Sequence, residues 1–435
     1  MSRLEPTNEA SAMQKEISAI AAQGGGTTKV EQLIQQYCPD GVEYKPLGEV
    51  CDFRNGFAFK SNLFTDEGSP IIRITNISEN NVDMSDLKYF HMEDYPKSDL
   101  SQFAIKKGDI LVAMSGATTG KIGTYKENIT AYLNQRTGKF EPKESLNNRF
   151  LYHFLQTQVS NMYKMAGGGA QPNLSSNDLK SKIVIPVPPL PVQEEIVRIL
   201  DTLTELQAEL QAELQKRLQQ YEYYKWNIFE GLSCPTKHIT DVALVKARVG
   251  WQRLTTAEYQ SIGDYYLITG TDFKNGKIDF GNCVFVSKER YEMDPNIIVG
   301  KGDILITKDG TLGKVAFLED EPNKPTTLNS GVFRIHTTDP KVSPRYLFHY
   351  FTSKYFTDFV NSVKTGSTIP HLTQQGLVSL NIPIPSLEEQ NRVVSILDRF
   401  DTLTTDLTAG LPAEIEARRK QYEYYRDKLL TFKKK

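Results

Sequence analysis

Residues 185–188 read Ile-Pro-Val-Pro and residues 199–201 read Ile-Leu-Asp. Both short sequences return 197 residues further along, as Ile-Pro-Ile-Pro at 382–385 and as Ile-Leu-Asp at 396–398. Self-similarity at a fixed period is the signature of a repeated structural unit. The chain is therefore expected to hold two copies of one module.

Further blocks extend this duplication over most of the chain. They recur in the same order, with an offset that drifts slowly from 194 to 201 residues. The paired blocks are Lys-Gly-Asp-Ile-Leu at 107–111 and 301–305, Arg-Phe-Leu-Tyr-His-Phe at 149–154 with Arg-Tyr-Leu-Phe-His-Tyr at 345–350, and Gln-Tyr-Glu-Tyr-Tyr at 220–224 and 421–425. A constant order with a small drift indicates an internal duplication rather than chance similarity.

A long helix is predicted after each proline-rich segment, because proline cannot occupy a helix interior and the apolar residues that follow have a helical period. Their 3-4-3-4 spacing is that of a coiled-coil seam. Two antiparallel helices would satisfy each other's seams, whereas the alternative is that each helix lies on its own domain. Gly410 and Pro412 are expected to break the second helix into two pieces. The seam residues are Ile196, Ile199, Leu203, Leu206 and Leu210 in the first copy, and Val393, Ile396, Phe400, Leu403 and Leu407 in the second.

Short strands separated by turn residues precede each helix and predict a globular domain in each copy. The predicted fold class is α+β: two repeated mixed α/β domains joined by two long helices that form an antiparallel coiled coil with pseudo-twofold symmetry. The predicted domains are a flexible N-terminal extension at 1–28, a first globular domain at 29–184, a central helical region at 185–232, a second globular domain at 233–381 and a C-terminal helical region at 382–435.

The composition is that of an ordinary globular protein, with 39% hydrophobic and 24% charged residues among 435. The net charge of −2 shows no basic excess, so a nucleic-acid partner has to be argued from architecture. The four cysteines are far apart, which excludes a clustered zinc site and predicts reduced, mostly buried thiols. Because the sequence shows neither a signal peptide nor a long apolar run, a cytoplasmic protein is expected.

Two enzyme classes fail on their motifs. An adenine methyltransferase needs an Asn/Asp-Pro-Pro-aromatic motif, and the only Pro-Pro, at 188–189, is followed by Leu190. The stretch 115–122 is similar to a phosphate-binding loop, but Ser115 replaces a required glycine and Ile122 replaces the hydroxyl residue that holds Mg²⁺. We therefore expect no catalysis by this chain and no metal or cofactor bound to it.

Taken together, these features resemble the specificity subunits of type I restriction–modification systems. The match runs from Cys-Pro-Asp-Gly-Val-Glu-Tyr at 38–44 to the closing segment 421–430, and the stretch 411–416 resembles the type IC branch. The resemblance implies two target recognition domains, each reading one half of an asymmetric, split target. It implies double-stranded DNA, two methyltransferase subunits and two restriction/translocase subunits as partners, with S-adenosylmethionine, ATP and Mg²⁺ bound by those subunits. The alternative is a two-headed coiled-coil adaptor that does not bind DNA.

Candidate DNA contacts lie in loops that align between the copies and in segments where the copies differ most. Arg, Asn and Gln pair with base edges, whereas Lys and glycine-rich turns suit phosphate. The alternatives are ordinary surface side chains, a hairpin turn that only closes the sheet, and a plain linker. The candidates are Arg54, Asn55, Arg73, Thr75, Asn76, Ser115, Thr118, Lys121, Gly168 and Gln171 in the first copy, and Lys246, Arg248, Trp251, Gln252, Arg253, Thr269, Thr271, Lys308, Thr311, Lys314, Gly366 and Ser367 in the second.

Three features concern the helices and their packing. His153 and His349 are interpreted as packing residues, and the tyrosines of 220–224 and 421–425 as helix-end packing, within the chain or against the methyltransferase subunit. Gln-Ala-Glu-Leu occurs twice in 207–214. One such unit changes the helix length by about 6 Å, which is close to two base-pair steps. The resemblance implies that these units set the DNA spacer, whereas the alternative is a helical filler.

Overall fold

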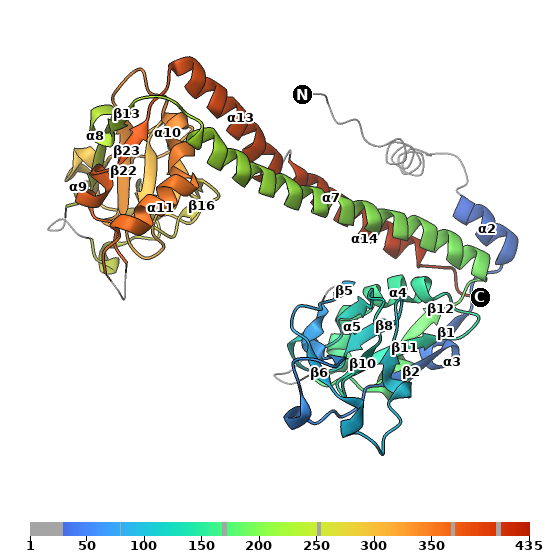
Figure 1. Ribbon diagram of the computed structural model, residues 1–435. Coiled ribbons are helices and arrows are strands. Elements are labelled where there is room, and N and C mark those ends of the chain that lie inside the picture. The colour runs from blue at the N-terminus through green and yellow to red at the C-terminus, as the bar shows by residue number, and fades with distance from the viewer. Residues whose placement is uncertain (1–28, 79, 168–171, 250–253, 367–369, 406–409) are drawn as a thin grey trace. The chain divides into compact units, whose positions relative to one another are not determined.

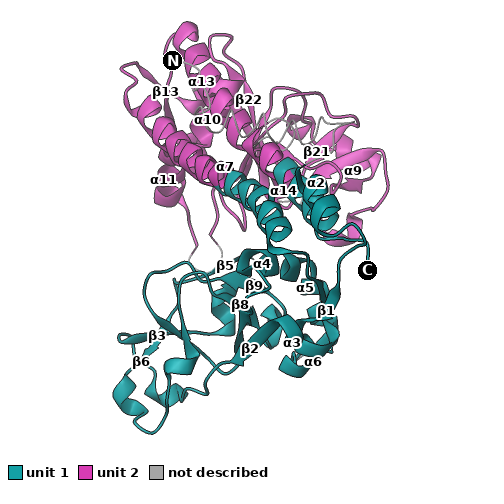
Figure 2. Ribbon diagram, turned by 90° about the vertical axis from the view of Figure 1, so that its right-hand side faces the viewer, with its two compact units in different colours: residues 1–208, 417–435 teal, residues 209–416 magenta. Residues whose placement is uncertain are grey.

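The computed structural model describes residues 29–78, 80–167, 172–249, 254–366, 370–405 and 410–435 (Figure 1). The chain divides into two compact units (Figure 2). Unit 1 takes Met1–Ala208 together with Ala417–Lys435, and unit 2 takes Glu209–Glu416. Each unit therefore combines a globular domain with portions of the long helices.

Two mixed sheets form the globular domain of unit 1. The larger sheet has the strand order β2-β11-β8-β9-β5-β4, with Cys51–Asn55 (β2), Thr137–Pro142 (β11), Ile110–Ala113 (β8), Ile122–Thr124 (β9), Asn80–Val82 (β5) and Ile77–Ser78 (β4). The smaller sheet has the order β6-β3-β10-β7, with Lys88–Phe90 (β6), Ser69–Ile72 (β3), Ala131–Leu133 (β10) and Ala104–Ile105 (β7). The pairs β5–β9 and β10–β3 are parallel and the other neighbours are antiparallel.

Short helices complete this domain and carry its core. Asn147 caps α4, because its side-chain oxygen accepts hydrogen bonds from the backbone N–H groups of Arg149 and Phe150. Phe150 and Leu151 are fully buried on that helix. The helices are Lys29–Tyr37 (α2), Leu47–Val50 (α3), Asn148–Thr157 (α4), Val159–Met165 (α5) and Ser176–Lys182 (α6), and Tyr44–Pro46 (β1) pairs with Val184–Pro186 (β12).

Unit 2 repeats this plan. Its larger sheet has the order β14-β22-β19-β20, with Ala243–Ala247 (β14), Val332–Thr337 (β22), Ile304–Thr307 (β19) and Val315–Phe317 (β20). A second sheet has the order β18-β15-β21, with Val284–Val286 (β18), Tyr265–Ile268 (β15) and Thr326–Leu328 (β21). Two pairs remain: Thr236–His238 (β13) with Asn381–Pro383 (β23), and Phe273–Lys274 (β16) with Lys277–Ile278 (β17). The helices are Ile239–Val242 (α8), Lys288–Glu292 (α9), Pro344–Phe351 (α10), Lys354–Val363 (α11) and Gln374–Val378 (α12).

The shared strand order confirms the predicted duplication of a mixed α/β domain. The series β2-β11-β8-β9 corresponds to β14-β22-β19-β20, and β6-β3-β10 corresponds to β18-β15-β21. The copies differ at two edges. The strand β7 extends the smaller sheet of unit 1 to four strands, whereas the matching sheet of unit 2 has three. In unit 1 the strands β5 and β4 extend the larger sheet, whereas in unit 2 the strands β16 and β17 form a separate hairpin.

The long helices follow the sequence prediction closely. Leu190–Glu230 (α7) is one continuous helix of 41 residues that begins within the proline-rich segment, with Pro191 in its first turn, where proline is tolerated. The second copy has two helices, Leu387–Thr405 (α13) and Leu411–Leu429 (α14). Gly410 forms a bend directly before α14, so the predicted break is confirmed.

Within each unit, the start of a long helix packs on its own domain together with the end of the other long helix. In unit 1, Ile196 and Leu203 of α7 share one hydrophobic core with Tyr422 of α14. In unit 2, Tyr221 of α7 stacks on Phe400 of α13, with the ring centroids 5.9 Å apart. The continuous coiled-coil pairing predicted from the seam stays a prediction.

A buried glutamine joins each domain to the first turns of its helix. The side-chain amide of Gln193 donates to the carbonyl oxygens of Ser145 and Pro188, at 2.9 and 2.7 Å. Gln390 makes the equivalent bonds to Lys341 and Pro385, both at 2.9 Å. The two glutamines lie 197 residues apart in the sequence, the same offset as the repeated blocks beside them.

Two further expectations concern cysteines and membranes. All four cysteines are free thiols, and three of them are buried. Across the described residues, we find no helix that combines the length and the apolar character needed to span a bilayer.

Candidate nucleic-acid interface

The predicted loops of the first copy converge at one end of its sheets. The hydroxyl of Thr118, in the β8–β9 loop, donates to the carbonyl oxygen of Ile74, which follows β3, at 3.1 Å. Ser115 in the same loop forms an antiparallel bridge with Asn173. Three segments that are distant in the sequence therefore meet, and we call their described residues, 73–76, 114–121 and 172–174, together with the turn 134–136 described next, loop cluster 1.

The turn between β10 and β11 belongs to this cluster and was missed from the sequence. Arg136 donates through Nη1 to the side-chain oxygen of Asn173 at 3.1 Å, and the N–H of Met114 donates to the carbonyl oxygen of Arg136 at 2.9 Å. Gln135 and Arg136 are exposed. A signal existed, because Leu-Asn occurs at 133–134 and again at 328–329, which fits the drifting repeat.

The second copy assembles the same elements into loop cluster 2, formed by 269–272, 308–314, 329–331 and 370–372. The N–H of Lys308 donates to the carbonyl oxygen of Gly331, and the N–H of Leu372 donates to that of Lys308, both at 2.9 Å. His371 Nδ1 lies 2.5 Å from a carboxylate oxygen of Asp309. These bonds join 308–314, 329–331 and 370–372, and the N–H of Asn329 donates to the carbonyl oxygen of Ile268, directly before 269–272, at 2.9 Å.

Exposed groups in the clusters suit contacts with a phosphate backbone. Lys314 is exposed and Lys121 is half-buried at equivalent places in the β19–β20 and β8–β9 loops. Gly120 and Gly313, which precede them, adopt φ of +84° and +72°, a conformation that favours glycine. Lysine charge is a usual means of binding phosphate. The backbone N–H groups of Gly120 and Gly313 already donate within the chain, to the carbonyl oxygens of Ala113 and Thr307 at 2.8 and 3.0 Å, so the lysine side chains carry this assignment.

The other described candidates have mixed surroundings. Thr75, Asn55, Thr311, Thr271 and Gly366 are exposed. Thr269 is half-buried, and its hydroxyl lies 2.7 Å from that of Thr271. Lys246 and Lys308 are half-buried, with the Lys308 amine 5.4 Å from the centre of the Phe333 ring.

Two arginines are partly engaged by carboxylates. Arg73 donates to Asp86 at 3.1 Å, and Arg54 pairs with Glu141 at 3.5 Å. For either guanidinium to bind DNA, its ion pair with the carboxylate would have to break or be shared with the DNA.

Two candidates are corrected by the structure, because their side chains are buried. Asn76 is only 2% exposed, and its amide donates to the carbonyl oxygens of Asp83 and Asp86. Arg248 is also 2% exposed, and it donates to the carbonyl oxygen of Leu328 at 2.9 Å and to the hydroxyl of Thr327 at 3.2 Å. Asn76 thus holds its own loop in place and Arg248 is bonded to the strand β21, so both side chains are directed into the domain and away from a ligand.

Six candidates lie outside the described residues. They are Gly168, Gln171, Trp251, Gln252, Arg253 and Ser367.

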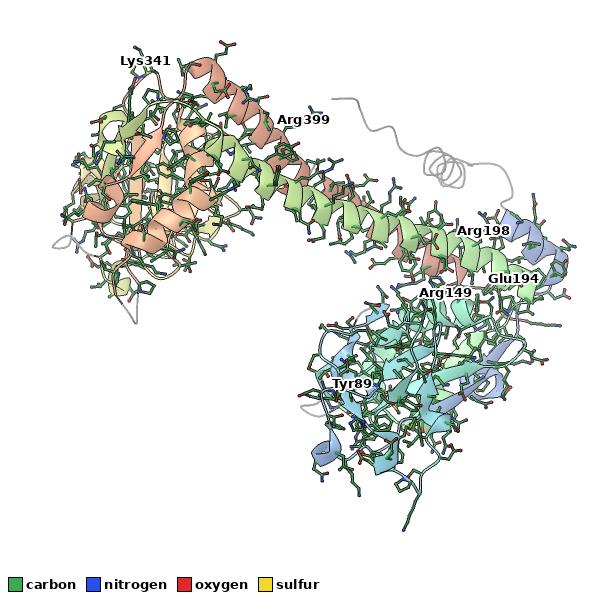
Figure 3. All side chains as sticks on the ribbon, viewed as in Figure 1. Tyr89, Arg149, Glu194, Arg198, Lys341 and Arg399 are labelled. Carbon is green, nitrogen blue, oxygen red and sulfur yellow. The ribbon has the colours of Figure 1, made fainter. Side chains whose placement is uncertain are left out.

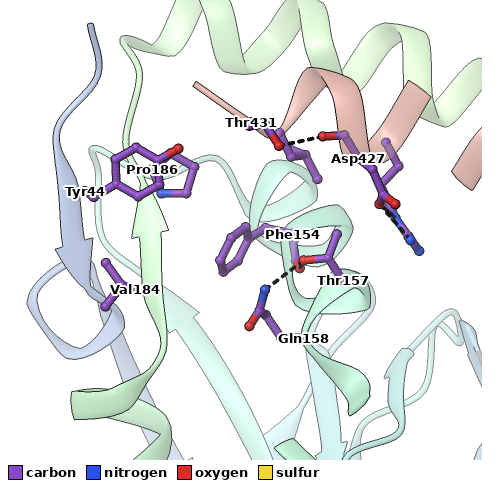
Figure 4. Close-up of a pocket in the computed structure, with 10 residues that line it drawn as sticks. Tyr44, Phe154, Thr157, Gln158, Val184, Pro186, Asp427 and Thr431 are labelled. Atoms are coloured by element: carbon purple, nitrogen blue, oxygen red, sulfur yellow. Dashed lines mark hydrogen bonds and ion pairs between the residues drawn. The ribbon is translucent and has the colours of Figure 1, made fainter. Parts of the chain in front are cut away.

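A surface cavity of about 400 Å³ lies elsewhere in unit 1 (Figure 4). Phe154 of α4, Pro186 of β12 and Asp427 of α14 line it, and no candidate DNA contact does. In unit 2, the position equivalent to Asp427 is Trp226, whose ring stacks on Tyr355 with the centroids 4.3 Å apart. Unit 1 thus has the smaller side chain at this duplicated position, on the wall of the cavity.

Comparison with known proteins gives consistent matches. The family model described as "Type I restriction modification DNA specificity domain" matches twice, at residues 39–220 and 236–417. A type I restriction enzyme specificity subunit of Haemophilus influenzae is 34% identical over 407 residues, which cover 90% of this chain and 96% of that protein.

Two further relatives agree. The EcoR124I/EcoR124II specificity subunit of Escherichia coli is 33% identical over 312 residues, covering 66% of this chain and 71% of that protein. The crystal structure of a type I restriction–modification S subunit from M. genitalium has a TM-score of 0.52 at 16% identity, covering 90% of this chain and 96% of that one. The structural likeness supports the fold, and membership of the family is concluded from the sequence matches.

Proposed function

The chain belongs to the family of type I restriction–modification DNA specificity subunits, and on that basis we propose that loop clusters 1 and 2 are the surfaces that read the two halves of its split target. As a member of this family, the chain recognises DNA and is not itself the catalyst. The adaptor alternative is not favoured, because both matched domains are DNA specificity domains.

One observation carries the proposal. The same four segments converge in both domains, although they are far apart in the sequence. The two copies share the frame of the cluster but differ in this turn: Gln135 and Arg136 are exposed in the first copy, whereas the equivalent Ser330 and Gly331 are half-buried in the second. A shared frame with different exposed groups is what two modules that read different bases require.

Phosphate and base contacts are assigned to different parts of each cluster. Lys121 and Lys314, beside their positive-φ glycines, are proposed phosphate contacts, which fix register without reading sequence. Gln135 and Arg136 are proposed base contacts of the first domain, since their exposed amide and guanidinium groups match adenine and guanine edges.

Partner subunits are proposed to complete the complex. Two methyltransferase subunits and two restriction/translocase subunits would supply catalysis, with S-adenosylmethionine, ATP and Mg²⁺ bound by those subunits. The chain carries a net charge of −2, so we expect it to bind DNA weakly alone and more tightly with methyltransferase subunits. We expect the complex to act in the cytoplasm, with the chain itself binding no cofactor.

Each repeated tyrosine block contains one tyrosine that packs within the chain and one that is free to pack against a partner subunit. Tyr221 and Tyr422 are buried within their units. Tyr223 and Tyr424, at equivalent positions, are 66% and 62% exposed. Large exposed aromatic side chains are typical of protein interfaces, so we propose that these two dock the two methyltransferase subunits.

The sharpest test of base reading is to change Gln135 in the complete modification complex. Gln135→Ala should relax one position of one half-motif, at a cost of about 1–3 kcal/mol in discrimination. Sequencing of methylated genomic DNA reads the motif directly. A uniform loss of methylation at all sites would instead mark a phosphate contact or a structural role.

The spacer prediction from the tetrapeptide repeat also stays open, as does the assignment to the type IC branch. Deletion of residues 211–214 shortens α7 by about 6 Å. We expect the gap between the half-motifs to shrink by about one base pair, because flexing absorbs part of the change. An active complex that keeps the original gap would contradict the prediction.

A further inference from the structure

An aspartate of α7 is held by two residues of the first domain. Arg149 and His153 stand four residues apart on α4, so both reach the same carboxylate. Arg149 donates to Asp201 Oδ1 through Nη2 at 2.5 Å, and His153 Nε2 lies 2.7 Å from the same oxygen. Figure 3 marks Arg149 where α4 meets α7. We call this group, Arg149, His153 and Asp201, clamp 1.

The second domain repeats the arrangement on α13. Arg345 Nε donates to Asp398 Oδ1 at 2.8 Å, and His349 Nε2 lies 2.6 Å from that oxygen. Arg345, His349 and Asp398 form clamp 2. The two clamps explain why the Arg-aromatic-His block and the Ile-Leu-Asp block recur together in the sequence. One supplies the cation and the imidazole, and the other supplies the carboxylate.

Burial makes these bonds directional rather than loosely electrostatic. Both imidazoles are fully buried, which refines the interpretation of His153 and His349 as packing residues. Burial lowers the pKa of both histidines, so each acts as a neutral hydrogen-bonding group near neutral pH. Burial alone would raise the pKa of Asp201, but hydrogen bonds from His153 and Arg149 outweigh it and lower this pKa to about 2. The carboxylate is therefore ionised at working pH.

The clamps are not the only attachment between domain and helix. The buried glutamines Gln193 and Gln390 hold the same domains to the first turns of the same helices. The clamp carboxylates lie two turns further along, eight residues after each glutamine. The first turns of each helix also share the hydrophobic core of the domain, as Ile196 and Leu203 do in unit 1. Loss of a clamp should thus loosen the angle of a domain, while the glutamine and the shared core keep the domain attached.

The two clamps differ in the partners of their arginine and histidine: Arg345 of clamp 2 also pairs with Glu319, at 3.1 Å. The Tyr422 hydroxyl of α14 lies 3.0 Å from His153 Nδ1, so clamp 1 ties three elements together. In clamp 2, His349 Nδ1 is buried with no hydrogen-bond partner among the described residues, and the equivalent Tyr221 stacks on Phe400 instead. The imidazole of clamp 1 is therefore the more fully hydrogen-bonded of the two.

We propose that Asp201 and Asp398 are positioning residues that fix the angle of each recognition domain on its helix and so restrict the complex to one spacing between half-motifs. This inference rests on the proposed function of the loop clusters. A small rotation at the clamp moves a distant loop further than it moves the helix. Rigid clamps therefore convert helix length into a defined DNA spacing, whereas pivoting domains would accept neighbouring spacings.

The test is to sequence methylated DNA from the complete modification complex carrying Asp201→Asn or Asp398→Asn. Each variant keeps the side-chain size but removes the charge that accepts from arginine. Matched controls are Glu209→Gln on α7 and Glu388→Gln on α13, which change exposed carboxylates on the same helices. Methylation at spacers one base pair longer or shorter should rise about tenfold relative to the original spacing, a change that corresponds to about 1.4 kcal/mol. Both half-motifs should stay unchanged, and the controls should keep the original spacing.

Other outcomes distinguish the possible failures. Folded, active variants that methylate only at the original spacing would overturn the positioning role. A changed half-motif would show that the aspartates act on base reading instead. If Asp201→Asn fails to assemble, Arg149→Lys retains the charge but loses the two-point contact, and it should broaden the spacing to a smaller degree. If the complex without any substitution methylates no split motif, the proposed function is refuted rather than this inference.

Discussion

In the first domain, the carbonyl oxygen of Leu133 accepts a hydrogen bond from the backbone N–H of Phe57 at 2.9 Å. In the second domain, the equivalent carbonyl, of Leu328, accepts from the guanidinium of Arg248, also at 2.9 Å. The chain after β2 lies against the sheet because Gly56 has no side chain, whereas a buried arginine occupies the equivalent position after β14. The same acceptor is thus satisfied by backbone in one copy and by a side chain in the other. The duplicated frame fixes which groups need partners, and the loops are free to supply them differently.

The largest effect expected from this comparison is that of Gly56→Ala. An added Cβ would overlap the carbonyl oxygen of Asn134, so the backbone has to move and the Phe57 bond is strained. We expect a loss of about 3 kcal/mol in the free energy of unfolding of unit 1. Denaturant unfolding followed by hydrogen exchange would locate the loss. A loss under about 1 kcal/mol would show that the first copy does not depend on this close approach.

Arg248→Ala tests the other half of the comparison. It leaves the Leu328 carbonyl without its donor and opens space in a buried site, so we expect unit 2 to lose about 2 kcal/mol of stability. Hydrogen exchange should report the change in the strands β15 and β21 and not in unit 1. Protection that stays unchanged in β21 would mean that Arg248 is not what holds the acceptor.

The pH dependence of stability, measured for the unchanged protein and for Asp201→Asn, tests clamp 1. The Asp201 carboxyl has its pKa lowered to about 2, below the unfolded value of about 3.9, so its stabilising contribution is full above about pH 5 and is lost as the pH falls toward 2. That contribution is about 2 kcal/mol. Asp201→Asn should therefore destabilise the protein near pH 7 and flatten the acid limb of its stability curve. An unchanged difference between the two proteins at pH 7 and pH 3 would contradict the assignment.

Among these changes, the smallest effect is expected for Lys121→Ala and Lys314→Ala. Each should weaken DNA binding by the methylation complex uniformly across sequences, and each should reduce the slope of log K against log salt by about 0.9. Fluorescence anisotropy at several salt concentrations measures both quantities. A change in sequence preference, with the slope unaltered, would make either lysine a base reader.

Sequence reasoning reached the elements that repeat or that have strong backbone signals. The duplication, the continuous α7 and the break before α14 follow from spacing, proline and glycine, which act locally. It failed where a side chain's direction depends on a distant partner. Asn76 and Arg248 have the polarity of surface readers, yet each is turned inward by carbonyl groups that other segments bring to it. The turn 134–136 was missed because its importance comes from its contact with 172–174 in space.

The central claim is that the two domains are separate reading modules on a common frame. Replacing residues 236–380 with the same region of a relative, within the complete modification complex, tests it most directly. We predict that sequencing of methylated DNA will show one half of the motif changed, with the other half unchanged. A change in both halves of the motif would contradict the claim.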